Sequence, residues 1–142
     1  MSPRILIVED EMIVAMEMEA VIEDLGFEPI GIAADTADAL SLAEKRPDVA
    51  LVDLNLRDGP TGPDIGRKLA ERGIQVVFVT ANPRMVANGI PGALGVVGKP
   101  IDDGTIASVI SFAIGQRDGE AVMPPPGFLP FGSGNVSAGQ IG

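Results

Sequence analysis

The chain has 142 residues, a net charge of −10 and a sequence pI near 4.2, and it contains no cysteine and no histidine. The length is that of one ordinary domain, and the acidic balance argues against a nucleic-acid partner held by phosphate contacts. The missing residue types exclude disulfides, thiolate or imidazole metal sites and Ser/His or Cys/His catalysis, which leaves Asp, Glu, Ser, Thr and Lys as nucleophiles.

The first part of the chain alternates short β-branched runs with segments of helical periodicity. The predicted elements are a strand at Arg4–Val8, a helix over 11–25 followed by Gly26, a weaker strand over 29–33, and a helix that Asp35 or Thr36 caps and that ends before Pro47. The apolar run 5–8 is too short for a signal peptide or a membrane span. We therefore expect a cytoplasmic protein without a membrane partner.

The run Val49-Ala50-Leu51-Val52-Asp53 predicts a strand buried on both faces of a parallel sheet. The elements expected after it are a helix over 65–71 closed by Gly73, a strand over 75–79 ending on Thr80, a short helix from Asn82-Pro83 to Gly89, a strand over 94–97, and a last helix that Asp102 or Asp103 caps and Gly115 ends.

Five strands alternating with five helices predict an α/β fold with a doubly wound parallel sheet, flavodoxin-like, of strand order 2-1-3-4-5, and helices on both faces. This domain covers residues 1–116. Residues 117–142 are rich in Pro and Gly and show no helical or alternating pattern, which indicates a tail. Within the tail, Phe128-Leu129-Pro130-Phe131 could dock on a surface.

The predicted strand order brings several polar residues to one edge of the sheet. Glu9 and Asp10 follow the first strand and Asp53 ends the third, so three carboxylates would crowd together and repel unless a cation neutralises them. Mg²⁺ takes oxygen ligands, and we expect Asp10, Asp53 and the main-chain carbonyl of Asn55 to bind it, with Glu9 acting through water.

Two further strand ends carry groups that suit a phosphoryl group at this edge. Lys99 offers a positive charge to one phosphoryl oxygen, and Thr80 offers a hydroxyl to another. Asp53 would be the nucleophile, since phosphoryl transfer needs an in-line attack with the other oxygens held and neutralised.

These residues resemble the receiver domain of two-component response regulators. The resemblance covers about residues 3–116 and includes the acidic pair after the first strand, Asp53, Thr80 followed by the small Ala81, and Lys99-Pro100. It implies that Asp53 accepts a phosphoryl group from a phosphohistidine on a sensor kinase or phosphotransfer protein, with Mg²⁺. It also implies a cis Lys99-Pro100 bond and a response on the face of the fourth helix, fifth strand and fifth helix.

The segments 53–62 and 79–83 look most like receivers served by HWE or HisKA2 kinases. Because no effector domain follows residue 116, we expect a stand-alone receiver, a monomer or weak dimer. It would signal to an unknown downstream protein by contact or act as a phosphate shuttle or sink. Such a protein catalyses its own phosphorylation and dephosphorylation and is not an enzyme with a separate substrate.

One position departs from the family pattern. Receivers usually carry Tyr or Phe three residues before the lysine, where this chain has Val96, so we expect the signal to travel through the backbone between Thr80 and Gly92.

There are three alternative functions. The acidic residues after the first strand disfavour a flavin carrier, because they would repel the flavin phosphate. A dehalogenase-type phosphatase is disfavoured because it needs an acid at the position of Asn55. The main alternative is a receiver that binds proteins independently of phosphorylation.

Overall fold

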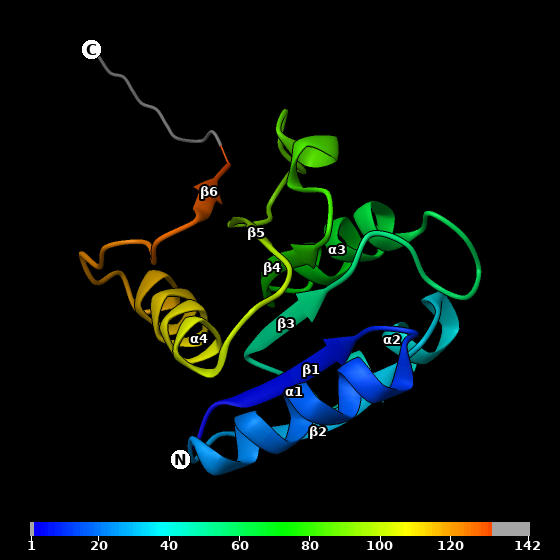
Figure 1. Ribbon diagram of the computed structural model, residues 1–142, viewed down its shortest axis with the longest axis horizontal. Coiled ribbons are helices and arrows are strands. Elements are labelled where there is room, and N and C mark those ends of the chain that lie inside the picture. Colours follow the sequence, from blue (N-terminus) through cyan, green and yellow to red (C-terminus); the bar gives the residue numbers. More distant parts are fainter. Residues whose placement is uncertain (1, 132–142) are drawn as a thin grey trace.

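The computed structural model describes residues 2–131, which form a six-stranded sheet with helices against both faces (Figure 1). The strands are Arg4–Val8 (β1), Glu28–Ala33 (β2), Val49–Val52 (β3), Gln75–Thr80 (β4), Gly95–Gly98 (β5) and Phe128–Pro130 (β6). The helices are Met12–Asp24 (α1), Thr36–Ala43 (α2), Gly62–Glu71 (α3) and Asp103–Arg117 (α4), with a 3₁₀ turn at Pro83–Val86 (η1). The order β2-β1-β3-β4-β5 is parallel throughout and confirms the predicted fold class.

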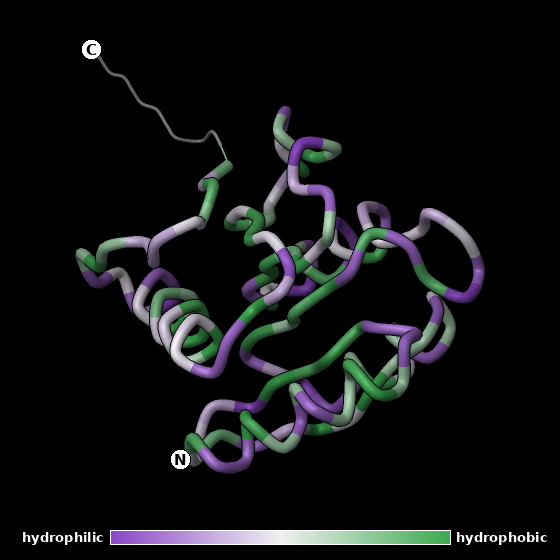
Figure 2. The backbone as a smooth tube through the Cα atoms, in the orientation of Figure 1, coloured by the Kyte–Doolittle hydropathy of each residue, from purple (hydrophilic) through white to green (hydrophobic). Residues whose placement is uncertain are grey.

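The central strands are buried on both faces, as their continuous apolar sequences predict. Figure 2 shows these hydrophobic stretches running along the sheet. On one face, α1 and α4 pack against residues such as Ile7 and Val77, and on the other α2 and α3 pack against residues such as Leu6 and Phe78. No helix within residues 2–131 is long and apolar enough to cross a membrane.

The short helix predicted from Asn82-Pro83 to Gly89 is wrong as an α-helix. The structure has a single 3₁₀ turn there, η1, and the Asn82 side chain makes no capping hydrogen bond. Gly89 has a φ of 90° and donates its N–H to Val86 O at 2.8 Å, so the backbone leaves the helical region before an α-helical ladder can form.

The last helix does not end at Gly115, which corrects the prediction. Helix α4 continues to Arg117, and a Cβ placed on Gly115 would lie 2.8 Å from Val122 Cγ1. Gly115 therefore does not end the helix, and its lack of a side chain instead allows Val122 of the following segment to pack closely against it. Helix α3 also begins three residues earlier than predicted, at Gly62.

A sixth strand lies within the segment predicted as a tail. Strand β6 pairs antiparallel with β5, with Val96 opposite Leu129 and Val97 opposite Phe128. A run of three residues ending in a proline carries too little alternation to predict a strand from sequence. The remainder of the predicted tail, residues 132–142, lies outside the described residues.

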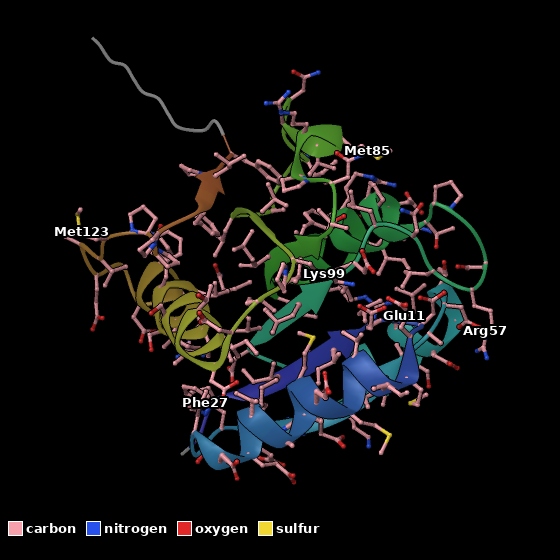
Figure 3. The ribbon with its side chains drawn as sticks, in the orientation of Figure 1. Glu11, Phe27, Arg57, Met85, Lys99 and Met123 are labelled. Carbon is pink, nitrogen blue, oxygen red and sulfur yellow. The ribbon has the colours of Figure 1, made fainter. Side chains whose placement is uncertain are left out.

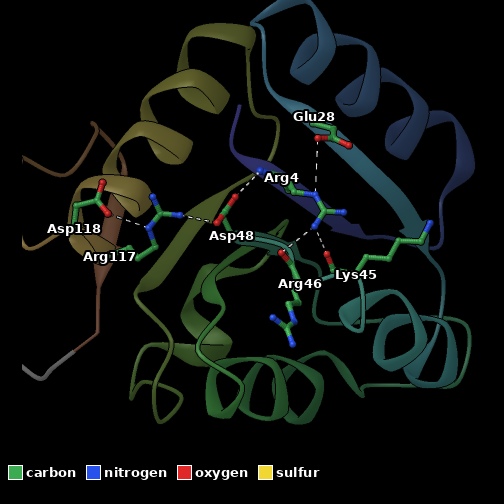
Figure 4. Close-up of polar contacts among 7 residues, drawn as sticks. All are labelled: Arg4, Glu28, Lys45, Arg46, Asp48, Arg117 and Asp118. Atoms are coloured by element: carbon green, nitrogen blue, oxygen red, sulfur yellow. Dashed lines mark hydrogen bonds and ion pairs between the residues drawn. The ribbon is translucent and has the colours of Figure 1, made fainter. Parts of the chain in front are cut away.

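A polar cluster ties the amino end of β3 to its neighbours (Figure 4). The Asp48 carboxylate accepts the Arg4 N–H at 2.8 Å through one oxygen and Arg117 Nη1 at 2.6 Å through the other. The Arg4 guanidinium in turn donates to the Lys45 carbonyl and lies 3.8 Å from a Glu28 carboxylate oxygen. Asp48 thus joins β1, β3 and α4 at the edge of the sheet opposite to the one that carries Glu9 and Asp53.

We expect Asp48→Ala to lower the free energy of unfolding by about 1–3 kcal/mol, because it leaves the partly buried Arg4 N–H without its acceptor and removes one of the two carboxylates that pair with Arg117. The matched control is Asp118→Ala, since Asp118 also pairs with Arg117 but in an exposed, sequence-adjacent contact. Its loss should change the stability by less than about 0.5 kcal/mol. Urea unfolding of both variants measures this, and equal losses would contradict the assigned role of Asp48.

Candidate functional site

The backbone ladder fixes two carboxylates at the same edge of the sheet. Asp53 directly follows β3 and donates its N–H to Val8 O at 2.9 Å, and Glu9 follows β1 and donates its N–H to Ala33 O at 2.8 Å. Each of these residues extends the backbone pairing of its strand by one position, and this pairing fixes the position of its Cα and Cβ atoms at the carboxyl edge of the sheet.

Lys99 lies between these two carboxylates. Its Nζ is 2.7 Å from Glu9 Oε1 and 2.9 Å from Asp53 Oδ2. Figure 3 shows Lys99 near the centre of the molecule. The three side chains are 18%, 3% and 12% exposed for Lys99, Glu9 and Asp53, so water screens their charges weakly. The Lys99-Pro100 peptide is cis, as the resemblance predicts.

The environment shifts the pKa of Glu9 and of Lys99. Burial raises the pKa of Glu9, although the hydrogen bonds from Lys99 and from the Glu11 N–H oppose this. Burial acts to lower the pKa of Lys99, but its hydrogen bonds to Glu9 and Asp53 outweigh that effect and the pKa is raised. The lysine is therefore a firmly charged ammonium at neutral pH.

The predicted acidic group is present. Carboxylate oxygens of Glu9, Asp10 and Asp53 all lie within 4.8 Å of one another, and Asp10 is exposed. A set of oxygen donors with one open side fits a hard divalent cation such as Mg²⁺. Asn55 lies two residues beyond Asp53 in an exposed loop, and its role as a carbonyl ligand stays a prediction.

Thr80 ends β4 and is 2% exposed. Its Oγ accepts the Asn82 N–H at 3.2 Å, and its carbonyl accepts the Lys99 N–H at 2.8 Å. Among the hydrogen bonds of the described residues, none joins Thr80 to Asp53. The structure therefore places Thr80 beside Lys99 at the predicted edge, and its contact with a phosphoryl group stays a prediction.

A polar network missed in the sequence holds the loop that follows Asp53. Arg57 pairs with Asp35 at 2.8 Å, and Asp58 accepts the Thr61 hydroxyl at 2.6 Å and the Thr36 N–H at 3.1 Å. The two hydrogen bonds to Asp58, that from the Thr61 hydroxyl first, lower the pKa of Asp58 from 3.8 to about 2. Their contribution to stability is therefore fully present above pH 3.8 and is lost as the pH falls toward 2. The turn sequence Asp-Gly-Pro-Thr at residues 58–61 is the sequence signal that could have predicted this network.

An apolar groove of about 700 Å³ opens beside Lys99. It lies between α1 and the chain that leads from Lys99 into α4. Its lining includes Val14, Met18, Val21, Ala81, Lys99, Pro100, Ile101 and Ile106. The outer side of α1 also exposes large apolar side chains, with Met12 at 51%, Ile13 at 76% and Met16 at 56% exposure.

Residues 5–111 match the family model described as the response regulator receiver domain. The chain belongs to this family of receiver domains. It is 36% identical over 118 residues to the phyllosphere-induced regulator PhyR of Methylorubrum extorquens, a match that covers 80% of this chain and 44% of that protein. The chain spans about half the length of the curated relatives it matches.

Solved receiver structures agree with this assignment. The solution NMR structure of the Erythrobacter litoralis PhyR response regulator REC domain has a TM-score of 0.74 at 29% identity and covers 86% of this chain and 97% of that one. The crystal structure of the anti-anti-sigma factor PhyR from Bartonella quintana has a TM-score of 0.71 at 28% identity, with 84% and 50% covered. The fold, the acidic group and Lys99 thus lie in a receiver domain of a two-component system.

Proposed function

We propose that this receiver accepts a phosphoryl group on Asp53 and that Lys99 and Thr80 hold the transferred group. The observation that carries the proposal is the position of Lys99 Nζ, 2.9 Å from Asp53 Oδ2 and largely shielded from water beside Glu9. An ammonium that already contacts the acceptor oxygen lies where negative charge gathers during transfer.

In the proposed reaction, a carboxylate oxygen of Asp53 attacks the phosphorus of a phosphohistidine in line with the P–N bond. The P–O bond forms as the P–N bond breaks, and the histidine nitrogen keeps the electron pair and is then protonated. Lys99 donates a hydrogen bond to one phosphoryl oxygen. The Thr80 hydroxyl donates a hydrogen bond to another phosphoryl oxygen while its own oxygen still accepts the Asn82 N–H.

Asp10, Asp53 and the main-chain carbonyl of Asn55 would hold Mg²⁺, with Glu9 acting through water. The support for this is the cluster of carboxylate oxygens within 4.8 Å and its exposed member, Asp10. When bound, the ion supplies positive charge that offsets the carboxylates and the incoming phosphoryl oxygens. Lys99 alone leaves this group of three carboxylates with excess negative charge.

We expect Asp10→Asn to weaken Mg²⁺ binding at least about tenfold, because it removes a charged oxygen ligand. Isothermal titration of the unphosphorylated protein with MgCl₂ measures the affinity. The control is Asp24→Asn, which removes an equal charge at the end of α1. If Asp10→Asn and Asp24→Asn bound Mg²⁺ as the wild type does, the ion would lie elsewhere.

The proposed phosphorylation is tested with acetyl phosphate and MgCl₂, followed by intact-protein mass spectrometry. The wild type and Asp24→Asn should each gain one phosphate, and Asp53→Asn should gain none because it lacks the nucleophile. Chelation of Mg²⁺ should abolish the gain. An unchanged yield in Asp53→Asn would rule out this site, and a wild type that gains no phosphate would favour a receiver that binds proteins independently of phosphorylation.

The proposed donor is a sensor histidine kinase, of the HWE or HisKA2 type, or a phosphotransfer protein. The apolar groove beside Lys99 and the exposed Met12, Ile13 and Met16 of α1 support docking of a protein next to the acceptor. We further propose that the chain works in the cytoplasm, passes the signal to a downstream protein, and has no catalytic activity beyond its own phosphorylation and dephosphorylation.

A further inference from the structure

Strand β6 and the residue after it form a separate feature, here named the C-terminal strap, residues 128–131. The family model ends at residue 111, so the strap lies outside the part of the chain that the family describes. It reaches β5 through residues 119–127, which include Pro124, Pro125 and Pro126 (Figure 1).

The strap makes backbone and ring contacts with the domain. Its strand pairs with β5, and Phe131 donates its N–H to Leu94 O at 2.9 Å. The Phe128 ring lies edge-on to Phe112 of α4 with centroids 5.0 Å apart, and the Phe131 ring lies 6.2 Å from that of Phe78 in β4. The strap therefore joins α4, β4 and β5.

Gly95 of β5 is fitted to the strap. A Cβ placed there would overlap the Leu129 carbonyl oxygen and lie 2.6 Å from Phe128 Cζ. All three atoms nearest to that position belong to the strap. A glycine inside a strand weakens the strand itself, and here the close approach of another backbone explains its presence.

The strap also contacts the segment that leads away from the candidate site. Thr80 directly precedes that segment, residues 81–94, and the strap donates a hydrogen bond to its far end at Leu94. A Cβ placed on Gly89, within the segment, would lie 3.6 Å from Phe131 Cβ, so the phenylalanine also covers its middle. Phe78, which Phe131 contacts, lies two residues before Thr80 on the same strand and therefore on the same face.

A small cavity connects the strap with the lysine. About 420 Å³ in volume, it is lined by residues that include Pro83 of η1, Lys99, Pro126 and Leu129. A shift of the Thr80–Pro83 turn or of Lys99 would therefore change the surface on which the strap and its linker rest.

We propose that the C-terminal strap is a releasable clamp on segment 81–94, docked in the unphosphorylated chain and loosened when Asp53 is phosphorylated. The inference rests on the proposed function. In the docked arrangement, Lys99 is engaged by Glu9 and Asp53, and the described hydrogen bonds of Thr80 stay within β4, β5 and the following turn. A phosphoryl group draws both residues to itself and moves the support of the strap.

The strap is suited to release because its strand is short and partly exposed. Its strand has three residues, of which Leu129 and Pro130 are exposed, and Pro130 has no N–H to donate. Short exposed elements open with a small local free energy, so a shift at Thr80 and Lys99 is enough to change how often the strap leaves β5. Release uncovers the edge of β5.

Hydrogen exchange with mass spectrometry tests the clamp in the full chain, with and without beryllofluoride and Mg²⁺ as the phosphoryl mimic. With the mimic, exchange in 128–131 and in β5 should rise about tenfold or more. Gly95→Ala should release the strap without the mimic and raise exchange in 81–94. Phe131→Ala should do the same, which covers the case that Gly95→Ala misfolds.

The matched control is Met123→Ala, since Met123 is 87% exposed in the linker (Figure 3) and should leave all rates unchanged. By linkage, Gly95→Ala and Phe131→Ala should also bind beryllofluoride about fivefold more tightly than the wild type. This equilibrium reading separates coupling from a merely local loss of structure.

The outcomes separate the clamp from the proposed function. If acetyl phosphate leaves Asp53 unmodified, the proposed function fails, and the trigger of the clamp fails with it. If Asp53 is phosphorylated while exchange in 128–131 is unchanged or slower, the clamp is refuted and the proposed function stands. If Gly95→Ala and Phe131→Ala free the strap while 81–94 keeps its wild-type rates, the strap does not hold that segment.

Discussion

Replacing Lys99 with alanine is expected to slow phosphorylation by acetyl phosphate about 100- to 1,000-fold, the cost typical of removing one preorganised charge-stabilising donor. Lys99 contacts Asp53 Oδ2 at 2.9 Å in a site that water screens weakly. Its loss also leaves Glu9 and Asp53 without their cation, and their mutual repulsion disfavours the approach of an anionic donor.

Initial rates of phosphate incorporation, followed by mass spectrometry, measure this effect. Lys68→Ala is the matched control, since Lys68 pairs with Asp64 at 3.1 Å in an exposed helical contact and should keep the wild-type rate. Lys99→Arg should fall between the two, because it keeps the charge but replaces a compact ammonium with a planar fork. A wild-type rate in Lys99→Ala would remove the lysine from the mechanism.

Replacing Gly62 with alanine is expected to lower the free energy of unfolding by about 3 kcal/mol, the upper part of the range for overpacking. A Cβ at Gly62 would overlap the Asp53 carbonyl oxygen and lie 2.5 Å from Leu54 Cα. Both contacts are backbone atoms, so no side chain can move aside. The Gly62 N–H also donates to Leu54 O at 2.9 Å and fixes this approach.

The control for Gly62→Ala is Gly104→Ala in the first turn of α4, where a Cβ would lie at an ordinary contact distance of 3.6 Å from Asp102 Oδ1. It should be neutral or stabilise the chain by up to about 1 kcal/mol, because alanine favours a helix. Urea unfolding compares the two. Since the loop after Asp53 must shift in Gly62→Ala, its phosphorylation should also slow, whereas equal stability of both variants would contradict the packing argument.

The sheet could be predicted because its strands are buried on both faces. A run such as Val49-Ala50-Leu51-Val52 is too short and too β-branched for another reading, and parallel strands restrict the topology to a few orders. Once that order is set, strand-end residues must share an edge, which is why the meeting of Glu9, Asp53 and Lys99 followed from the sequence.

The features that the sequence did not predict depend on long-range contacts. Gly115 has the pattern of a helix end, but its role is set by Val122, which packs where a Cβ would lie. Strand β6 forms because Gly95 lets it approach, and neither segment shows this alone. The network around Asp58 likewise joins residues from separate loops.

Val96 illustrates both what the sequence predicts and what only the structure shows. Its departure from the aromatic pattern is visible in the sequence, and the structure buries it completely. The same hydrophobic cluster contains Phe78 and receives Phe131 from the strap. An aromatic ring thus reaches this face of the sheet from a segment far along the chain. The passage of the signal through the backbone from Thr80 to Gly92 stays a prediction.

The most direct test of the account is to locate the acyl phosphate itself. The protein is treated with acetyl phosphate and MgCl₂, reduced with sodium borohydride, which converts an aspartyl phosphate to homoserine, and digested for peptide mass spectrometry. We expect homoserine at position 53 alone, and none when Mg²⁺ is chelated. Homoserine at another aspartate, or its absence at position 53 in a protein that has gained phosphate, would contradict it.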